Sequence, residues 1–253
     1  MELFDTHSHY NDKAFNEDLE DVWEKVREAG VTKLVCIGYN LQSSKKAIEL
    51  ADKYDFVYAT CGISPNDIAE SSLEDIEEIY KLAKNKKVVA IGEIGLDYYW
   101  NKDNKELQKK FFIKQIELAN KLNLPITIHS RDAHIDTIDV LKKVKCINTG
   151  IFHCCPLNVE LIKEGLKLGY YISFSGVITF KNAKPELAIK EVPLDRLLIE
   201  TDCPYMAPEP HRGKRNDSSY VIEMVRKLAK EKNIELEEMA KITYENAMRI
   251  YKI

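Results

Sequence analysis

The feature that most constrains the fold is a regular alternation between short apolar runs and longer charged, amphipathic stretches. Strands that alternate with helices pair in parallel through right-handed crossovers. Helical periodicity is clearest at Leu19–Ala29, Leu73–Ala83 and Leu107–Leu122. The eight runs, rich in β-branched and aromatic residues, are Leu3–His7, Lys33–Gly38, Phe56–Gly62, Val88–Glu93, Pro125–His129, Ile147–His153, Tyr170–Ser175 and Arg196–Thr201. The pattern therefore predicts an α/β protein built on a parallel sheet.

The number of units favours a closed barrel. Eight strand–helix units in 253 residues average about 32 residues each, a size typical of a (β/α)8 TIM barrel. An open doubly wound sheet is the alternative, and a glycine-rich turn after the first strand would favour it, but that turn reads THSHYND. Two further helices are expected at Ser218–Lys230 and Glu235–Tyr251, and no low-complexity linker divides the chain. We expect a single domain spanning residues 1–253.

Net charge, the absence of long apolar runs and the cysteine content exclude several classes of protein. Lys and Arg total 37 against 41 Asp and Glu, and the resulting net charge of −4 excludes a generally basic nucleic-acid coat protein, although not a local basic site. The N-terminus carries no basic and apolar leader, and no run of 18 apolar residues occurs, so we expect a cytoplasmic protein without a membrane partner. Six cysteines without a CxxC pair predict reduced core thiols rather than a disulfide framework.

Residues of metal-ligating types end five of the eight apolar runs. Catalytic groups of a barrel lie at the C-terminal ends of its strands, where the following loops converge. A single histidine or carboxylate there is usually a hydrogen-bonded rim residue or a helix cap, but four of the six histidines gather at such ends. The residues are His7, His9, Glu93, His129, His153 and Asp202. Together they predict a metal site at this face of the barrel.

The spacing His7-x-His9 places both imidazoles on one face of a strand, so both can reach one cation. Asp5 shares that face and is expected to orient a histidine. Glu93 has two carboxylate oxygens and can bridge two cations. His129 and His153 then complete the second site, and Asp202 completes the first.

Such a ligand set predicts metal-assisted hydrolysis. Mixed imidazole and carboxylate ligands suit Zn²⁺, Mn²⁺, Fe²⁺ or Ni²⁺ and take Mg²⁺ less naturally. A suitable cation lowers the pKa of bound water from 15.7 to about 7. We therefore expect two divalent metal ions, with Asp202 as general base and Glu93 as the second catalytic carboxylate. No Gly-x-Ser-x-Gly elbow supports a serine nucleophile.

Seven segments, running from residue 5 to residue 221, resemble the TatD family of metal-dependent deoxyribonucleases, within the amidohydrolase-like barrels. The combination of GEIGLD, ETDCPY and RGKRN in this order is highly specific. The resemblance implies divalent metals held by the same six residues, and hydrolysis of single-stranded DNA as a 3′→5′ exonuclease, commonly with Mg²⁺. The segments are DTHSHY, GEIGLDYYW, PITIHSRDA, FHC, YYISFSGVITFKNA, LLIETDCPYMAP and RGKRNDSSYV.

Two loops depart from the family pattern. Where family members commonly carry histidines in a CGxHPH-like segment, this chain reads CGISPND, with Ser64 and Asn66 at those positions. After the sixth run the family is often FSG-like, whereas here Cys154 to Asn158 read CCPLN. No proposed ligand is lost, but the way the substrate is held is left open.

A phosphodiester substrate needs cationic groups near the metals. Aromatic side chains can stack on unpaired bases or pack against a neighbouring loop. The candidates for either role are Tyr98, Tyr99 and Trp100 of the YYW segment. Arg212 and Arg215 have an alternative role, pairing with Glu200 or Glu209 to brace their loop. The predicted substrate-binding residues are Arg131, Lys181, Arg212, Lys214, Arg215, Tyr98 and Tyr205.

Three functions are consistent with these residues. The first is a deoxyribonuclease that binds DNA transiently. The second is a metal-dependent ester or amide hydrolase, such as an aminoacyl-tRNA deacylase, for which the altered CGISPND loop leaves room. The third, a non-catalytic nucleic-acid or scaffold protein, is disfavoured by the intact ligand set. The native metal, a preference for DNA or RNA, an endo- or exonucleolytic mode and the oligomeric state stay open.

Overall fold

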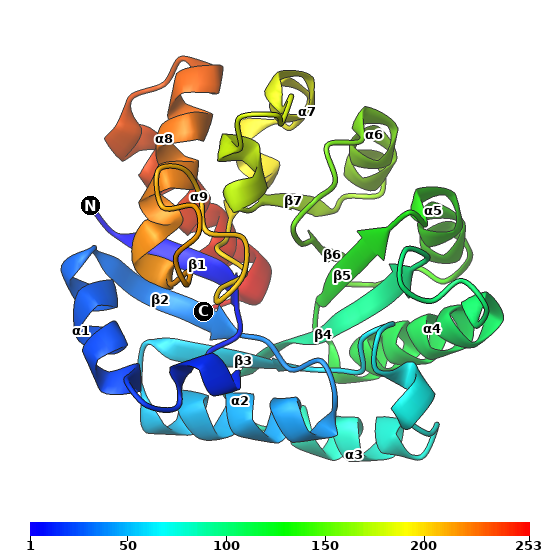
Figure 1. The fold of residues 1–253 in the computed structure, drawn as a ribbon. Helices are drawn as coiled ribbons and strands as arrows, with labels where there is room; N and C mark the ends of the chain where they lie inside the picture. The colour runs from blue at the N-terminus through cyan, green and yellow to red at the C-terminus, as the bar shows by residue number, and fades with distance from the viewer.

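Eight parallel strands form one sheet whose order follows the chain (Figure 1). The computed structural model describes residues 1–253. Between the last and first strands the seam is bridged by the Asp202 amide, just past the end of the last strand, which donates to the His7 carbonyl of the first at 2.9 Å. The predicted (β/α)8 TIM barrel, nearly closed, is thereby confirmed. The strands are β1 Leu3–Ser8, β2 Val31–Cys36, β3 Val57–Cys61, β4 Val88–Asp97, β5 Ile126–Arg131, β6 Gly150–Phe152, β7 Tyr171–Phe174 and β8 Leu197–Ile199.

Helices surround the strands (Figure 1). The longest, α4, buries Phe112, Ile116 and Ala119, whose spacing of three and four residues turns one face inward. The α-helices are α1 Leu19–Glu28, α2 Leu41–Lys53, α3 Asp75–Leu82, α4 Lys105–Leu122, α5 His134–Lys143, α6 Val159–Lys167, α7 Glu186–Glu191, α8 Val221–Lys232 and α9 Leu236–Tyr251. Short 3-10 turns are η1 Lys13–Phe15, η2 Ile68–Glu70, η3 Gly176–Thr179, η4 Leu194–Arg196 and η5 Ser218–Tyr220.

Two apolar layers fill the molecule. The larger joins strands to helices, and the smaller combines residues from six strands with the last turns of α9. Neighbours such as Leu3 and Phe4 belong to different layers because successive strand side chains point to opposite faces. From α9, the Tyr251 hydroxyl donates to the Thr6 carbonyl at 3.0 Å. The barrel is therefore a packed core below the polar ends of its strands.

None of the helices combines the length and apolar character needed to cross a membrane. All six cysteines are free thiols, and five of them are buried. This agrees with their expected role as small core residues.

Asp5 fastens the seam between β1 and β8. Its carboxylate accepts hydrogen bonds from the Thr201 amide (2.9 Å), from the hydroxyls of Thr201 and Ser218 (both 2.5 Å), and from the His7 amide (3.3 Å). Burial raises the pKa of Asp5 to about 7, against the lowering effect of these bonds. Asp5 thus contacts the main chain of His7 and not its imidazole. The pairing register of β1 shifts between Asp5 and Ser8, around His7.

Replacing Asp5 by alanine should lower the free energy of unfolding by about 2–4 kcal/mol, because buried donors on Thr201 and Ser218 lose their acceptor. Urea denaturation of the metal-free protein measures the loss. Asp55→Ala is the matched control, since Asp55 is exposed. Equal stability of the two variants would show that the seam does not depend on this carboxylate.

Candidate metal centre

The ends of the strands bring the six predicted ligands into one largely buried cluster. The Nε2 atoms of His7 and His9 lie 3.2 Å apart, and so do Nδ1 of His129 and Nε2 of His153. Glu93 lies between the two pairs, with Oε2 3.5 Å from Nε2 of His7 and Oε1 3.1 Å from Nδ1 of His129. Each carboxylate oxygen therefore faces one pair of histidines, the arrangement expected of a bridging ligand.

Asp202 belongs to the first of these pairs. Its Oδ1 lies 3.1 Å from Nε2 of His9 and 3.4 Å from Nε2 of His7. The contacts of this carboxylate with both histidines go through Oδ1, and its side chain retains 13% exposure. Oδ2 takes no part in these contacts.

Glycine lets β4 approach β5 at the cluster. Gly95 is paired with His129 and has φ +141°, a backbone conformation that other residues rarely adopt. A Cβ atom there would lie 2.0 Å from the His129 carbonyl oxygen. The register of β4 also shifts between Ile91 and Ile94, around Glu93. The GEIGLD segment thus fixes the position of Glu93 against His129.

The electrostatics keep both carboxylates ionised. Burial alone would raise the pKa of Glu93, but the charge of His153 and the hydrogen bond from His129 hold that pKa well below its usual range. The pKa of Asp202 is lowered against the opposing effect of burial, through its hydrogen bond with His9. Burial, with the neighbouring His153, lowers the pKa of His7. The cluster therefore presents anionic oxygens beside imidazole nitrogens.

These residues fit divalent cations. The ligand atoms of His7, His9 and Glu93 form one group within 4.8 Å of one another, and those of Glu93, His129 and His153 form a second. In each histidine pair two imidazole nitrogens face each other at 3.2 Å, with ionised carboxylate oxygens beside them. A cation shared by the two nitrogens satisfies this arrangement. These two candidate groups share Glu93, and a third consists of His7, His153 and Glu200.

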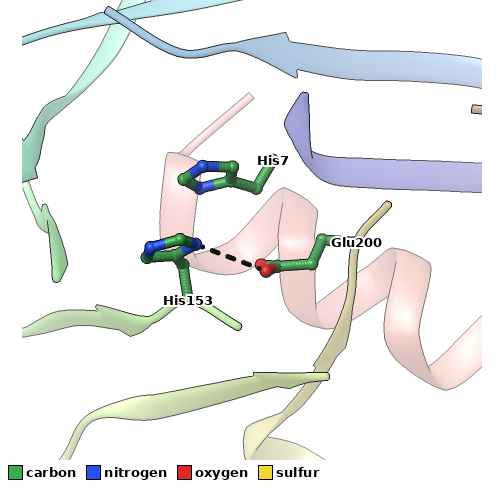
Figure 2. Close-up of side chains that lie close together, drawn as sticks. All are labelled: His7, His153 and Glu200. Atoms are coloured by element: carbon green, nitrogen blue, oxygen red, sulfur yellow. Dashed lines mark ion pairs between the residues drawn. The ribbon is translucent and has the colours of Figure 1, made fainter. Parts of the chain in front are cut away.

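Glu200 is a member of this cluster that the sequence interpretation missed (Figure 2). Its Oε1 accepts a hydrogen bond from the Cys154 amide at 2.5 Å and lies 3.4 Å from Nδ1 of His153, while Oε2 is buried without a partner. The rings of His7 and His153 stack with centroids 3.9 Å apart. A usable signal was present, because Glu200 lies in the eighth apolar run, two residues before Asp202.

Asp97, at the end of β4, was also missed. Its Oδ2 lies 2.9 Å from Nε2 of His129. The bond from Nε2–H to Asp97 fixes the imidazole with Nδ1 facing Glu93, where a bound cation would take the place of the proton on Nδ1. Asn66 occupies one of the positions where the family commonly has a histidine, and its Nδ2 donates to the same Oδ2 at 3.4 Å. The altered loop therefore supports Asp97 through an amide.

A cavity of about 410 Å³ opens onto the cluster, and its lining includes His129, His153 and Asp202. Two predicted substrate contacts, Arg131 and Tyr205, line the same cavity. They stay predictions that this geometry supports.

Tyr98 lies elsewhere. It is 7% exposed, its hydroxyl donates to Asp136 of α5 at 2.6 Å, and the Lys105 ammonium lies over its ring. Tyr98 is therefore a largely buried residue outside the lining of the cavity, and its contact with a substrate stays a prediction.

The basic loop after β8 is partly engaged with the protein itself. Arg215 forms an ion pair with Asp18 at 2.6 Å, and Arg212 donates to the Ala207 carbonyl at 2.8 Å. The expected pairing of either arginine with Glu200 is wrong, since Glu200 is held within the cluster. Two other predicted contacts, Lys181 and Lys214, are exposed, and their role stays a prediction.

Comparison with known proteins decides the family. The family model described as TatD related DNase matches residues 4–252. The chain belongs to the TatD-related DNase family. It is 46% identical to the "Uncharacterized metal-dependent hydrolase YabD" of Bacillus subtilis, over 99% of this chain and 99% of that protein. It is 37% identical to YcfH of Escherichia coli, another metal-dependent hydrolase by name, over 100% of this chain and 97% of that protein.

Solved structures agree with the TatD assignment. The crystal structure of YJJV, a TatD homologue from Escherichia coli, superposes with a TM-score of 0.94 at 28% identity and covers 99% of this chain and 98% of its own. A TatD family hydrolase from Entamoeba histolytica gives a TM-score of 0.88 at 26% identity, with coverage of 99% and 98%. The protein is accordingly a metal-dependent hydrolase of the TatD family, with candidate His and Glu metal-binding groups in place.

Proposed function

We propose that this TatD family member is a deoxyribonuclease that shortens single-stranded DNA from its 3′ end with two divalent metal ions. The observation that carries the proposal is the pair of ligand groups sharing Glu93 beside a cavity lined by Arg131. Paired cations that clamp a phosphodiester are typical of phosphoryl-transfer hydrolases. A cavity of about 410 Å³ is within the range that small ligands of nucleotide size occupy.

When bound, the cations would polarise the phosphoryl oxygens and make water a stronger nucleophile at neutral pH. His7, His9 and Asp202 would hold one of them, His129 and His153 the other, and Glu93 both. These roles rest on the distances among the ligand atoms in the cluster.

Asp202 is assigned the proton transfer. A general base must be ionised and within reach of the attacking water. The pKa of Asp202 is below its usual value, and Oδ2 makes none of the contacts with His7 and His9. This oxygen can accept the proton of the water that attacks the phosphorus.

Arg131 is assigned to the phosphate. Arg131 is exposed, lines the cavity, and follows His129 by two residues on the same strand. Guanidinium groups bind phosphate oxygens through paired N–H donors. The substrate phosphate would therefore be held between this side chain and the metal centre.

A cleavage assay tests the proposal. Purified protein is incubated with each divalent metal and with 3′-labelled single-stranded DNA, the matching duplex, or an aminoacyl ester. We expect labelled mononucleotides from the single strand, less product from the duplex, and none after addition of EDTA. Hydrolysis of the ester without cleavage of DNA would instead assign the deacylase function, whose support is the replacement of loop histidines by Ser64 and Asn66. Absence of DNA cleavage with every metal would overturn the nuclease.

A further inference from the structure

Tyr99 and Trp100 form an exposed aromatic pair at the edge of the metal centre. They are 48% and 66% exposed. Their rings meet edge to face, with centroids 4.7 Å apart. The guanidinium of Arg131 lies over both, at 3.9 Å from the Tyr99 centroid and 5.6 Å from that of Trp100. Two aromatic faces and one cation therefore share a single accessible patch.

The patch is fixed relative to the metal ligands. The amides of Tyr99 and Trp100 both donate to Oδ1 of Asp97, at 2.9 and 3.0 Å. The other oxygen of Asp97, which is fully buried, is the one that bonds Nε2 of His129 at 2.9 Å. One carboxylate thus anchors the aromatic pair and orients a candidate metal ligand.

Arg131 connects the patch to the cleft. It lines the cavity together with His129 and Asp202 and also covers the ring of Tyr99. A nucleotide chain with a phosphate in that cavity would bring a neighbouring base to the aromatic pair, while Arg131 neutralises phosphate charge. The positive charge of Arg131 and the continuity of the patch with the cavity both favour a polyanionic ligand that carries flat, apolar faces.

We propose that Tyr99 and Trp100, braced by Arg131, are a stacking platform for an unpaired base of a single-stranded nucleic acid. The inference rests on the proposed function and names the structural basis of its strand preference. Bases stack on aromatic side chains with little regard to sequence. A base inside a duplex has both faces covered by its neighbours, so the platform selects unpaired strands.

The two tryptophans of the chain provide the test. Trp23 is fully buried, whereas Trp100 is exposed, so a ligand stacked at the surface changes the emission of Trp100. The wild-type protein is titrated with a short oligothymidylate in EDTA at low salt, so that no hydrolysis occurs. We expect the emission to be quenched, and we expect an oligomer of abasic sites of equal length to quench far less. Equal quenching by both oligomers would overturn the platform.

Variants provide the second arm. Trp100→Ala should weaken oligothymidylate binding, measured by fluorescence anisotropy, about 5- to 100-fold, while Trp100→Phe retains most of the affinity because it keeps an aromatic face. Leu187→Ala is the matched control, since Leu187 is 70% exposed on α7. Wild-type affinity in Trp100→Ala would overturn the platform, even where the cleavage assay shows a working nuclease. Base-dependent quenching by a protein that cleaves no DNA would support the platform and overturn the nuclease alone.

Discussion

Asp202→Asn should reduce the turnover number about 10²- to 10⁴-fold, the contribution typical of a general base. The amide has nearly the shape of the carboxylate but does not take up the proton of the attacking water. The fold and at least one metal should remain, because the group of Glu93, His129 and His153 does not include this residue. Turnover on single-stranded DNA at saturating metal, together with elemental analysis of the same sample, measures both effects.

The control for this substitution is Asp55→Asn, which removes one charge from an exposed position and should leave turnover unchanged. A pH profile adds a second readout. The acidic limb that reports ionisation of the base should disappear in Asp202→Asn and persist in the control. Near-normal turnover in Asp202→Asn would reject the proton-transfer role and reduce Asp202 to a ligand of the His7 and His9 pair.

The barrel could be predicted because its strands are short, apolar and regularly spaced. Boundaries were predicted less well where composition and pairing disagree. The fourth run was expected to end at Glu93, but β4 extends to Asp97 because Gly95 permits a close approach to β5. The sixth was expected from Ile147, yet pairing starts at Gly150 and Ile147 is 72% exposed. Apolar character alone does not show which residues a neighbouring strand covers.

The six candidate ligands could be predicted because a barrel gathers the C-terminal ends of its strands at one face. Residues that contact a metal-ligating side chain, rather than a metal ion, were not predicted. Asp97 orients His129, and Glu200 lies against His153, so neither role is visible without the three-dimensional neighbours. Proximity in the sequence offered a partial signal, since Glu200 lies two residues before Asp202 and Asp97 lies four residues after Glu93.

Substrate contacts were the least predictable part of the site. The contacts of long side chains on loops depend on tertiary packing. Examples are the ion pair of Arg215 with Asp18 and the hydrogen bond of Tyr98 with Asp136. Tyr98 of the YYW segment was expected to contact the substrate, but its hydroxyl is bonded to Asp136 of α5. Burial separates Tyr98 from its neighbours Tyr99 and Trp100, which remain exposed.

Glu93→Ala should lower bound metal from two ions per chain to one or fewer, and turnover at least about 100-fold. The side chain offers one oxygen to each histidine pair, at 3.5 Å from His7 and 3.1 Å from His129. Its removal deprives both groups of their shared anion and leaves the four imidazoles to repel one another when protonated. Elemental analysis after gel filtration gives the stoichiometry, and calorimetric titration of the metal-free protein gives the affinity.

The matched control is Glu106→Ala, because the Glu106 side chain is 88% exposed at the start of α4 and should leave metal content unchanged. Glu93→Gln refines the result, since the amide keeps one oxygen donor but loses the negative charge. A bridging role predicts that this variant binds a single ion, whereas a purely electrostatic role predicts two weakly bound ions. Two tightly bound ions in Glu93→Ala would contradict a shared centre, because only separate ligand sets for His7 and His129 would then account for them.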